Sequence, residues 1–132
     1  MIAIDTNVLV RFLTQDDPDQ ARAATNLMNG LGESDPGFVC REVVVELVWV
    51  LERAYGFGRS DVARALEGLL SAAEIVVEAA DDVGRTAFRY REGGFGFADL
   101  MIAAAARRQD AVPLVTFDRK AARIPGVELL TH

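Results

Sequence analysis

The chain has 132 residues, of which 51% are hydrophobic and 26% are charged, so it is long enough to bury a substantial core as one domain. Cys40 is the only cysteine, which excludes an internal disulfide and favours a reducing, cytoplasmic setting. The N-terminus has no cationic stretch followed by an apolar segment, and no apolar run approaches the roughly 18 residues of a membrane span. We therefore expect neither a signal peptide nor a membrane partner.

The formal net charge is −6, which by itself argues against a nucleic-acid partner. A group of catalytic acids would account for much of this excess, however, and a bound metal ion would reverse the local sign. The overall charge therefore does not exclude RNA.

Strand-like and helical segments alternate along the chain. In order, the pattern predicts strand 2–4, helix 7–13, helix 19–31 preceded by Pro18, strand 38–40, helix 41–55, helix 61–72 with Ser60 as its N-cap, strand 74–77, helix 81–92, helix 98–109, strand 113–117 and strand 127–130. This alternation predicts one α/β domain over residues 1–132, with a mostly parallel central sheet flanked by helices.

Two aspartates end predicted strands. Asp5 follows the apolar run 1–4, and Asp118 follows the run 113–117. Both runs are apolar on both faces, as in short buried strands of a parallel sheet. Because ligands bind at the carboxyl ends of such strands, we expect the two carboxylates to meet at one edge of one sheet.

Two further acids stand in unusual settings. Glu46 is the one charged residue between Val43 and Leu51, and neither Arg41 nor Arg53 has the spacing to pair with it along a helix. Asp99 precedes a helix-forming run. Four acids from four separated segments are typical of a site for a hard divalent cation.

Each acid also has an ordinary structural interpretation. Asp5 could cap a helix, Asp99 could favour a helix dipole, and Asp118 could be a turn residue. Glu46 could lie on a solvated helix face together with Glu42 and Arg53. A shared site explains all four acids at once.

Other chemistries lack their residues. His132 is the only histidine, which argues against histidine-based zinc sites and Ser-His-Asp catalysis, and no glycine-rich phosphate loop is present. Gly93–Gly96 is expected to be a flexible connection before Asp99. We assign the aromatic residues mainly to the core or to an interface: Trp49, Phe88, Tyr90, Phe95 and Phe97.

Taken in order, four segments resemble the PIN-domain family, and within it the VapC-type toxin ribonucleases of bacterial toxin–antitoxin pairs: IAIDTNVLVRFL, VVVELVWVLERAYG, GFADLMIAAAARR and LVTFDRKAARIPGVELL. The resemblance implies a metal-dependent endoribonuclease in which Asp5, Glu46, Asp99 and Asp118 hold Mg²⁺ or Mn²⁺. It further implies two supporting hydroxyls and one accessory acid, which are Thr6, Thr116 and Glu42. Gly96 stands where some relatives have another acid.

The same resemblance implies an RNA substrate, a co-encoded antitoxin and a homodimer. The antitoxin would cover an acidic groove between helices 7–13 and 41–55, and the dimer contacts would involve Trp49 or the aromatics of 88–97. Two other functions are weighed against this one. A haloacid-dehalogenase-like phosphatase would need a second aspartate where Asn7 stands, and a non-catalytic PIN-like binding module would have no use for the four acids.

Overall fold

The computed structural model describes residues 1–131. His132 lies outside these residues, so the structure does not address the expectation, based on that residue, that histidine-based zinc sites and Ser-His-Asp catalysis are absent. The described chain forms β1 (Ile2–Ala3), α1 (Thr6–Thr14), α2 (Pro18–Asn29), β2 (Gly37–Val39), α3 (Arg41–Arg53), α4 (Arg59–Ser71), β3 (Ile75–Val77), α5 (Ala80–Arg91), α6 (Phe97–Arg108), β4 (Leu114–Thr116), the 3₁₀ helix η1 (Ala121–Arg123) and β5 (Val127–Leu129). The predicted α/β alternation is confirmed. The N-cap of α4 is Gly58, however, so the assignment of Ser60 is wrong.

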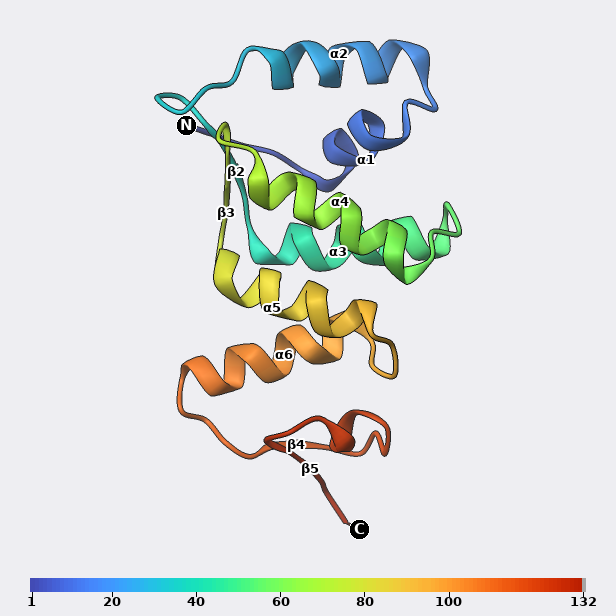
Figure 1. Ribbon diagram of the computed structural model, residues 1–132, viewed down its shortest axis with the longest axis vertical. Helices are drawn as coiled ribbons and strands as arrows, with labels where there is room; N and C mark the ends of the chain where they lie inside the picture. The colour runs from blue at the N-terminus through green and yellow to red at the C-terminus, as the bar shows by residue number, and fades with distance from the viewer. Residues whose placement is uncertain (132) are drawn as a thin grey trace.

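All strand pairs are parallel, but they form two sheets. The first has the order β1-β2-β3, and the second contains β4 and β5. Figure 1 shows these sheets in different parts of an elongated molecule, with α5 and α6 lying between them. The expectation that the strands before Asp5 and Asp118 share one sheet is therefore wrong within a single chain.

The second sheet is held at this place by apolar contacts of its connecting segment. Ile124 is only 4% exposed, and with Pro125 it lines a pocket formed mainly by α5 and α6. Val127 of β5 is also part of the core. By contrast, Ile2 is 43% exposed and Val115 is 56% exposed, so β1 and β4 are not the buried strands that their sequences predict.

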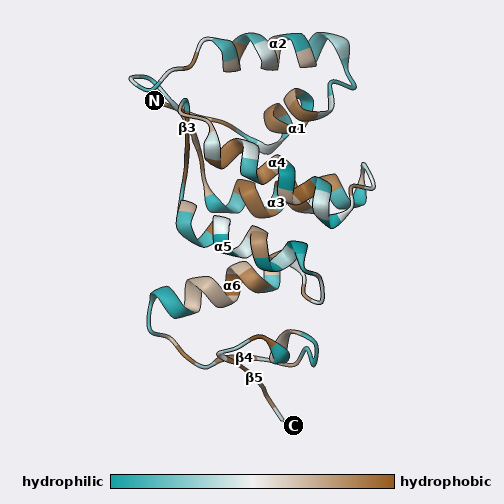
Figure 2. Cartoon of the chain, viewed as in Figure 1, coloured by the Kyte–Doolittle hydropathy of each residue, from teal (hydrophilic) through white to brown (hydrophobic). Residues whose placement is uncertain are grey.

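The core lies around α3. Val44, Leu47, Val48 and Leu51 repeat at helical spacing and are buried, and Figure 2 shows α3 as a largely hydrophobic helix in the middle of the molecule. The opposite face of α3 carries four exposed side chains, Glu42, Glu46, Trp49 and Arg53. The helical interpretation of this stripe is thus confirmed, and it sets the direction in which Glu46 points.

The aromatic residues divide as expected between core and surface. Tyr90, Phe95 and Phe97 are buried, whereas Phe88 and Trp49 are largely exposed. Tyr90 and Phe97 pack edge to face with ring centroids 5.6 Å apart. Among residues 1–131, none of the helices has the length and hydropathy needed to cross a membrane.

Candidate active site

Asp5 lies where the chain leaves β1 and enters α1. Its backbone is extended, and its Oδ1 accepts a hydrogen bond of 2.7 Å from the Thr6 N–H, so Asp5 is the N-cap of α1. The Oδ2 atom receives no hydrogen bond from residues 1–131. The structural interpretation and the functional one are therefore compatible, since capping uses one oxygen and leaves the other as a ligand.

Thr6 connects Asp5 to Glu46. The Thr6 side chain is buried, and its hydroxyl donates a short hydrogen bond to Oε1 of Glu46, which joins the first turn of α1 to α3. Asp5, Thr6 and Glu46 line one pocket of about 290 Å³, together with Asn7, Val10, Arg11, Val50, Ala54 and Tyr55. Two of the four predicted acids are thus brought to one pocket, and Thr6 fixes the position of one of them.

A second and larger pocket of about 590 Å³ adjoins the first, because Glu46 lines both. Its walls come from α3 and α6 and comprise Arg41, Glu42, Val45, Glu46, Trp49, Ala98, Met101, Ile102 and Ala105. Glu42 therefore shares a pocket with Glu46, as an accessory acid would. Trp49, at 58% exposed, forms part of an open apolar wall beside these acids.

Asp99 lies in the first turn of α6, next to Ala98 of the larger pocket, but does not line that pocket itself. Its Oδ2 is 3.4 Å from the point where a Cβ on Gly96, the N-cap residue, would lie. The carboxylate is therefore close to the positive end of the α6 dipole, which agrees with the structural interpretation of this acid.

Asp118 lies apart from the other acids, in the segment between β4 and η1. Its Oδ1 accepts hydrogen bonds of 2.8 Å and 3.0 Å from the N–H groups of Lys120 and Ala121, and its own N–H donates to Thr116 Oγ1. Asp118 thus binds two N–H groups at the start of η1, a helix that the sequence pattern missed and whose N-cap is Lys120. Within residues 1–131, no three His, Cys, Asp or Glu side chains gather as a metal site, so the predicted convergence of four acids is not found in one chain.

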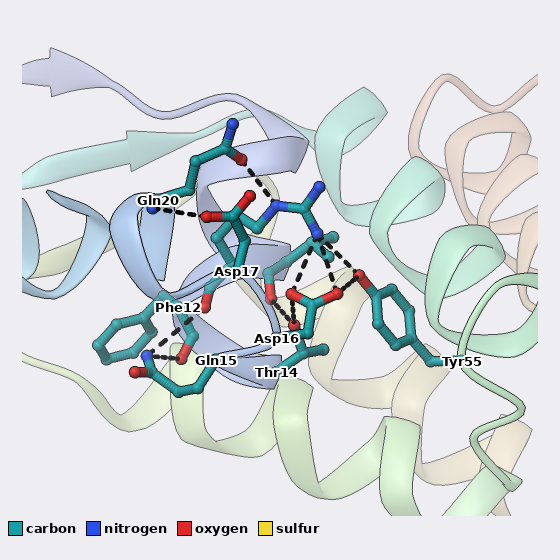
Figure 3. A network of polar contacts seen from close by, with 9 residues as sticks. Phe12, Thr14, Gln15, Asp16, Asp17, Gln20 and Tyr55 are labelled. Carbon is teal, nitrogen blue, oxygen red and sulfur yellow. Dashed lines mark hydrogen bonds and ion pairs between the residues drawn. The ribbon is translucent and has the colours of Figure 1, made fainter. Parts of the chain in front are cut away.

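The candidate acids have no basic partners. Across residues 1–131, no Arg or Lys nitrogen lies within 4.0 Å of the carboxylates of Asp5, Glu42, Glu46, Asp99 or Asp118. Arg11 lines the smaller pocket, but its guanidinium is held by Asp16, Gln20 and Tyr55, the three of which are labelled in Figure 3. The pocket therefore contains carboxylates whose charge is not compensated by the described chain.

Arg41 is a residue of this site that sequence reasoning missed. It lines the larger pocket with Glu42 and Glu46, and its Nη2 donates a 3.1 Å hydrogen bond to the Met101 carbonyl. Its backbone N–H is bound by Oε1 of Glu78. The sequence signal was its place at the start of α3, one residue before Glu42.

The donor set suits a hard cation. Asp5 and Glu46 offer oxygen ligands alone, and each has one oxygen without a hydrogen bond from residues 1–131. Mg²⁺ is commonly held by one or two carboxylates while it keeps several waters. The smaller pocket therefore fits Mg²⁺ or Mn²⁺ chemically, although a single chain supplies it with fewer acids than the sequence predicts.

The comparisons with known proteins identify the family of this chain. Residues 2–127 match the PIN domain family. The chain is also 26% identical over 121 residues to a protein named VapC ribonuclease from Aquifex aeolicus (strain VF5), in an alignment that covers 91% of this chain and 89% of that relative. The resemblance predicted from the four sequence segments is confirmed, and the chain belongs to the PIN domain family.

Proposed function

We propose that this protein is a Mg²⁺- or Mn²⁺-dependent endoribonuclease and the toxin of a toxin–antitoxin pair. One observation carries the proposal. Asp5 and Glu46 are both held by Thr6, Asp5 through the backbone N–H and Glu46 through the hydroxyl; they line one pocket and lack a basic partner within residues 1–131. Uncompensated carboxylates in a pocket cost stability, so they indicate a site selected for binding rather than for folding.

Asp5 and Glu46 would hold the metal ion through the oxygens that capping and the Thr6 hydroxyl leave unused. A bound Mg²⁺ or Mn²⁺ supplies Lewis acidity toward the phosphodiester and lowers the pKa of a coordinated water. Thr6 keeps the Glu46 carboxylate oriented toward Asp5 at the start of α1. Asp99 and Asp118 complete the acidic quartet in this proposal, with Thr116 positioning Asp118 through its backbone N–H.

The larger pocket would receive the RNA strand. Arg41 offers a cation to a backbone phosphate, and the exposed ring of Trp49 offers a face for a base. Glu42 and Glu46 repel a phosphate that arrives without metal, so cleavage should depend on divalent cation at two levels, substrate entry and chemistry.

The antitoxin would compete for this larger pocket between α3 and α6, and not only for the groove between helices 7–13 and 41–55 expected from the sequence. Val45, Trp49, Met101 and Ile102 form an apolar wall beside two uncompensated glutamates. This combination suits an amphipathic helix that carries one Arg or Lys toward the acids. We place the enzyme in the cytoplasm, where RNA and a co-encoded antitoxin would be available.

The phosphatase alternative is weaker. Asn7 lines the smaller pocket beside Asp5, and it stands where that chemistry needs a second aspartate. A non-catalytic binding module would not require Asp5 and Glu46 to remain uncompensated.

The test is cleavage of a panel of single-stranded and structured RNAs by the purified protein with Mg²⁺, with Mn²⁺ and with EDTA. We expect cleavage with either metal, none with EDTA, and none by an Asp5→Asn variant. Asp19→Asn is the matched control, because Asp19 is an exposed aspartate that lines neither pocket. Cleavage that survives chelation, or no cleavage of any RNA by a folded protein, would overturn the proposal.

A further inference from the structure

The strand β1 has a free edge. The N–H groups of Ile2 and Ile4 donate to the carbonyls of Pro36 and Phe38 at 3.2 Å and 2.9 Å, so both residues face β2. Because alternate residues of a strand direct their backbone groups to opposite neighbours, the N–H and C=O of Ala3 face the other side. Within residues 1–131, β1 is the last strand on that side of its sheet.

The strand β4 has a matching free edge. The Leu114 N–H donates to the Gly126 carbonyl at 2.9 Å, and the Thr116 carbonyl accepts from the Leu130 N–H at 2.7 Å, so these two residues face β5. The backbone groups of Val115 face away from β5. In the described chain this edge, like that of β1, carries no further strand.

Both edges have the composition of interior strands. Met1–Ile4 contains no charged side chain, and neither it nor Leu114–Phe117, which Pro113 precedes, contains the Pro or Lys that commonly protects an edge. Their exposed apolar side chains are those expected of parallel strands whose two faces are covered inside a larger sheet. Ile124 keeps β4 packed below α5 and α6, so one copy of the chain does not join its own two edges.

We propose that two copies of this chain pair these edges reciprocally, with β4 of each copy lying parallel to β1 of the other. The product is a two-fold dimer with two sheets of order β3-β2-β1-β4-β5, in which the last two strands come from the second copy. Each candidate active site then receives Asp118 from the second copy. The catalytic use of that Asp118 rests on the proposed function, whereas the strand exchange does not.

The positions of the acids support this pairing. Asp5 follows the last residue of β1 by two positions, and Asp118 follows the last residue of β4 by two positions. Parallel neighbouring strands lie about 4.8 Å apart. Pairing β1 and β4 laterally, with their last residues in register, therefore places these two aspartates side by side. One of the acids absent from the pocket, Asp118, and the missing strand of the sheet are thus supplied by one contact.

Charge also favours the exchange. Arg119 and Lys120 directly follow Asp118, are exposed, and form no ion pair within residues 1–131. They would arrive with the second copy at the edge that carries Asp5 and Glu46. Their positive charge reduces the repulsion that bringing a further acid to this edge would otherwise cause.

The first test is the mass of the full-length protein in solution, by light scattering and native mass spectrometry. We expect a dimer of twice the chain mass of 14.3 kDa. Val115→Pro removes the N–H that faces the free edge of β4 and should convert the dimer to monomer. Leu129→Pro is the matched control, because its N–H faces away from β4 on the outer edge of β5, where a proline is tolerated.

Ala3→Pro tests the same contact from β1 and serves if Val115→Pro fails to fold, as judged by circular dichroism. A monomeric wild-type protein would overturn the exchange. So would a dimer that withstands both Val115→Pro and Ala3→Pro, since that result would assign the interface to another surface, such as the one around Trp49.

The second test is complementation between two inactive variants. Co-expressed Asp5→Asn and Asp118→Asn chains form mixed dimers in which one site combines the intact Asp5 of one copy with the intact Asp118 of the other. Random pairing should restore about a quarter of the wild-type activity, because half of the dimers are mixed and each has one intact site.

If each chain completes its own site, every site in the mixture carries one substitution and no activity returns, which overturns the exchange. If the wild-type protein cuts no RNA, the proposed function fails, and the mass of the proline variants still decides whether the strands are exchanged.

Discussion

The acids in and beside the smaller pocket are held in opposite ways. On one side, Asp16 lies beside the pocket and contacts two of its lining residues: it accepts hydrogen bonds from the Tyr55 hydroxyl at 2.6 Å, from Thr14 at 2.8 Å and from Arg11 at 3.0 Å (Figure 3). On the other side, Asp5 and Glu46 receive one backbone and one hydroxyl hydrogen bond and no cation. The first arrangement stabilises a charge, and the second leaves charge available to a ligand.

The difference separates folding from function within a few residues. Three hydrogen bonds lower the pKa of Asp16 to about 2: the largest effect comes from the Tyr55 hydroxyl, the next from the Thr14 hydroxyl and a smaller one from the Arg11 guanidinium. Arg108 likewise lowers the pKa of the buried Asp82 on α5 through a 2.9 Å contact. These acids strengthen the folded state, whereas Asp5 and Glu46 are expected to weaken it until a cation binds.

The largest expected effect is on catalysis. Glu46→Gln should lower metal-dependent RNA cleavage by about 100-fold or more, since even residues behind metal ligands cost 10- to 100-fold when changed. The melting temperature without metal should stay the same or rise, because a negative charge is removed from the pocket. A Glu46→Gln protein that cuts RNA at the wild-type rate would remove Glu46 from the site.

Metal binding at Asp5 and Glu46 should raise the stability of the folded protein. Mg²⁺ that binds only the folded protein should stabilise it by about 2.7 kcal/mol at a concentration of 100 times its Kd. Differential scanning fluorimetry across a Mg²⁺ titration measures the resulting rise in melting temperature. We expect it to persist in Asp82→Asn and to be largely lost in Glu46→Gln; equal shifts in the two variants would place the metal elsewhere.

A smaller effect is expected at Thr6, which holds Glu46 in the pocket. Thr6→Val keeps the shape of a buried side chain but removes the hydroxyl that contacts Glu46, so it should lower cleavage about tenfold and cost about 1 kcal/mol of stability. Thr6→Ser retains the hydroxyl and should recover most of the activity. If Thr6→Ser loses activity while Thr6→Val keeps it, packing of the Thr6 methyl group rather than its hydrogen bond is responsible.

The smallest effect concerns pH. Because the pKa of Asp16 lies at about 2 in the folded protein, below its ordinary value of 3.8, the ionised form stabilises folding. This contribution is complete above pH 3.8 and is lost as the pH falls toward 2. Asp16→Asn should therefore be less stable than wild type in urea at pH 7 and nearly equal to it at pH 2. A difference that stays constant with pH would contradict this assignment.

Sequence alone predicts the elements and the family because those signals are local. The helical spacing of Val44, Leu47 and Leu51 places Glu46 on the opposite face of α3, and the apolar run before Asp5 places that acid at the end of a strand. The order of the acid-bearing segments carries the family resemblance. None of these inferences requires knowledge of how distant segments pack.

The sequence could not predict which distant segments pack against one another. The edge of β4 fits β1 of its own chain or of a second copy, and the choice depends on the packing of Ile124 against α5 and α6. The Asp16–Tyr55 contact joins residues 39 positions apart, and nothing in the local pattern of either residue signals it. Arg41 was missed for the same reason, since its role follows from where α6 packs on α3.

The most direct test of the account compares Asp5→Asn with Asp82→Asn in one Mg²⁺-dependent cleavage assay, with the unfolding free energy of each protein measured in parallel. We predict that Asp5→Asn stays at least as stable as wild type without metal and loses about 100-fold or more of its activity. Asp82→Asn should lose about 1 kcal/mol of stability and keep its activity. Full activity in folded Asp5→Asn would contradict the claim that the uncompensated acids are the active site.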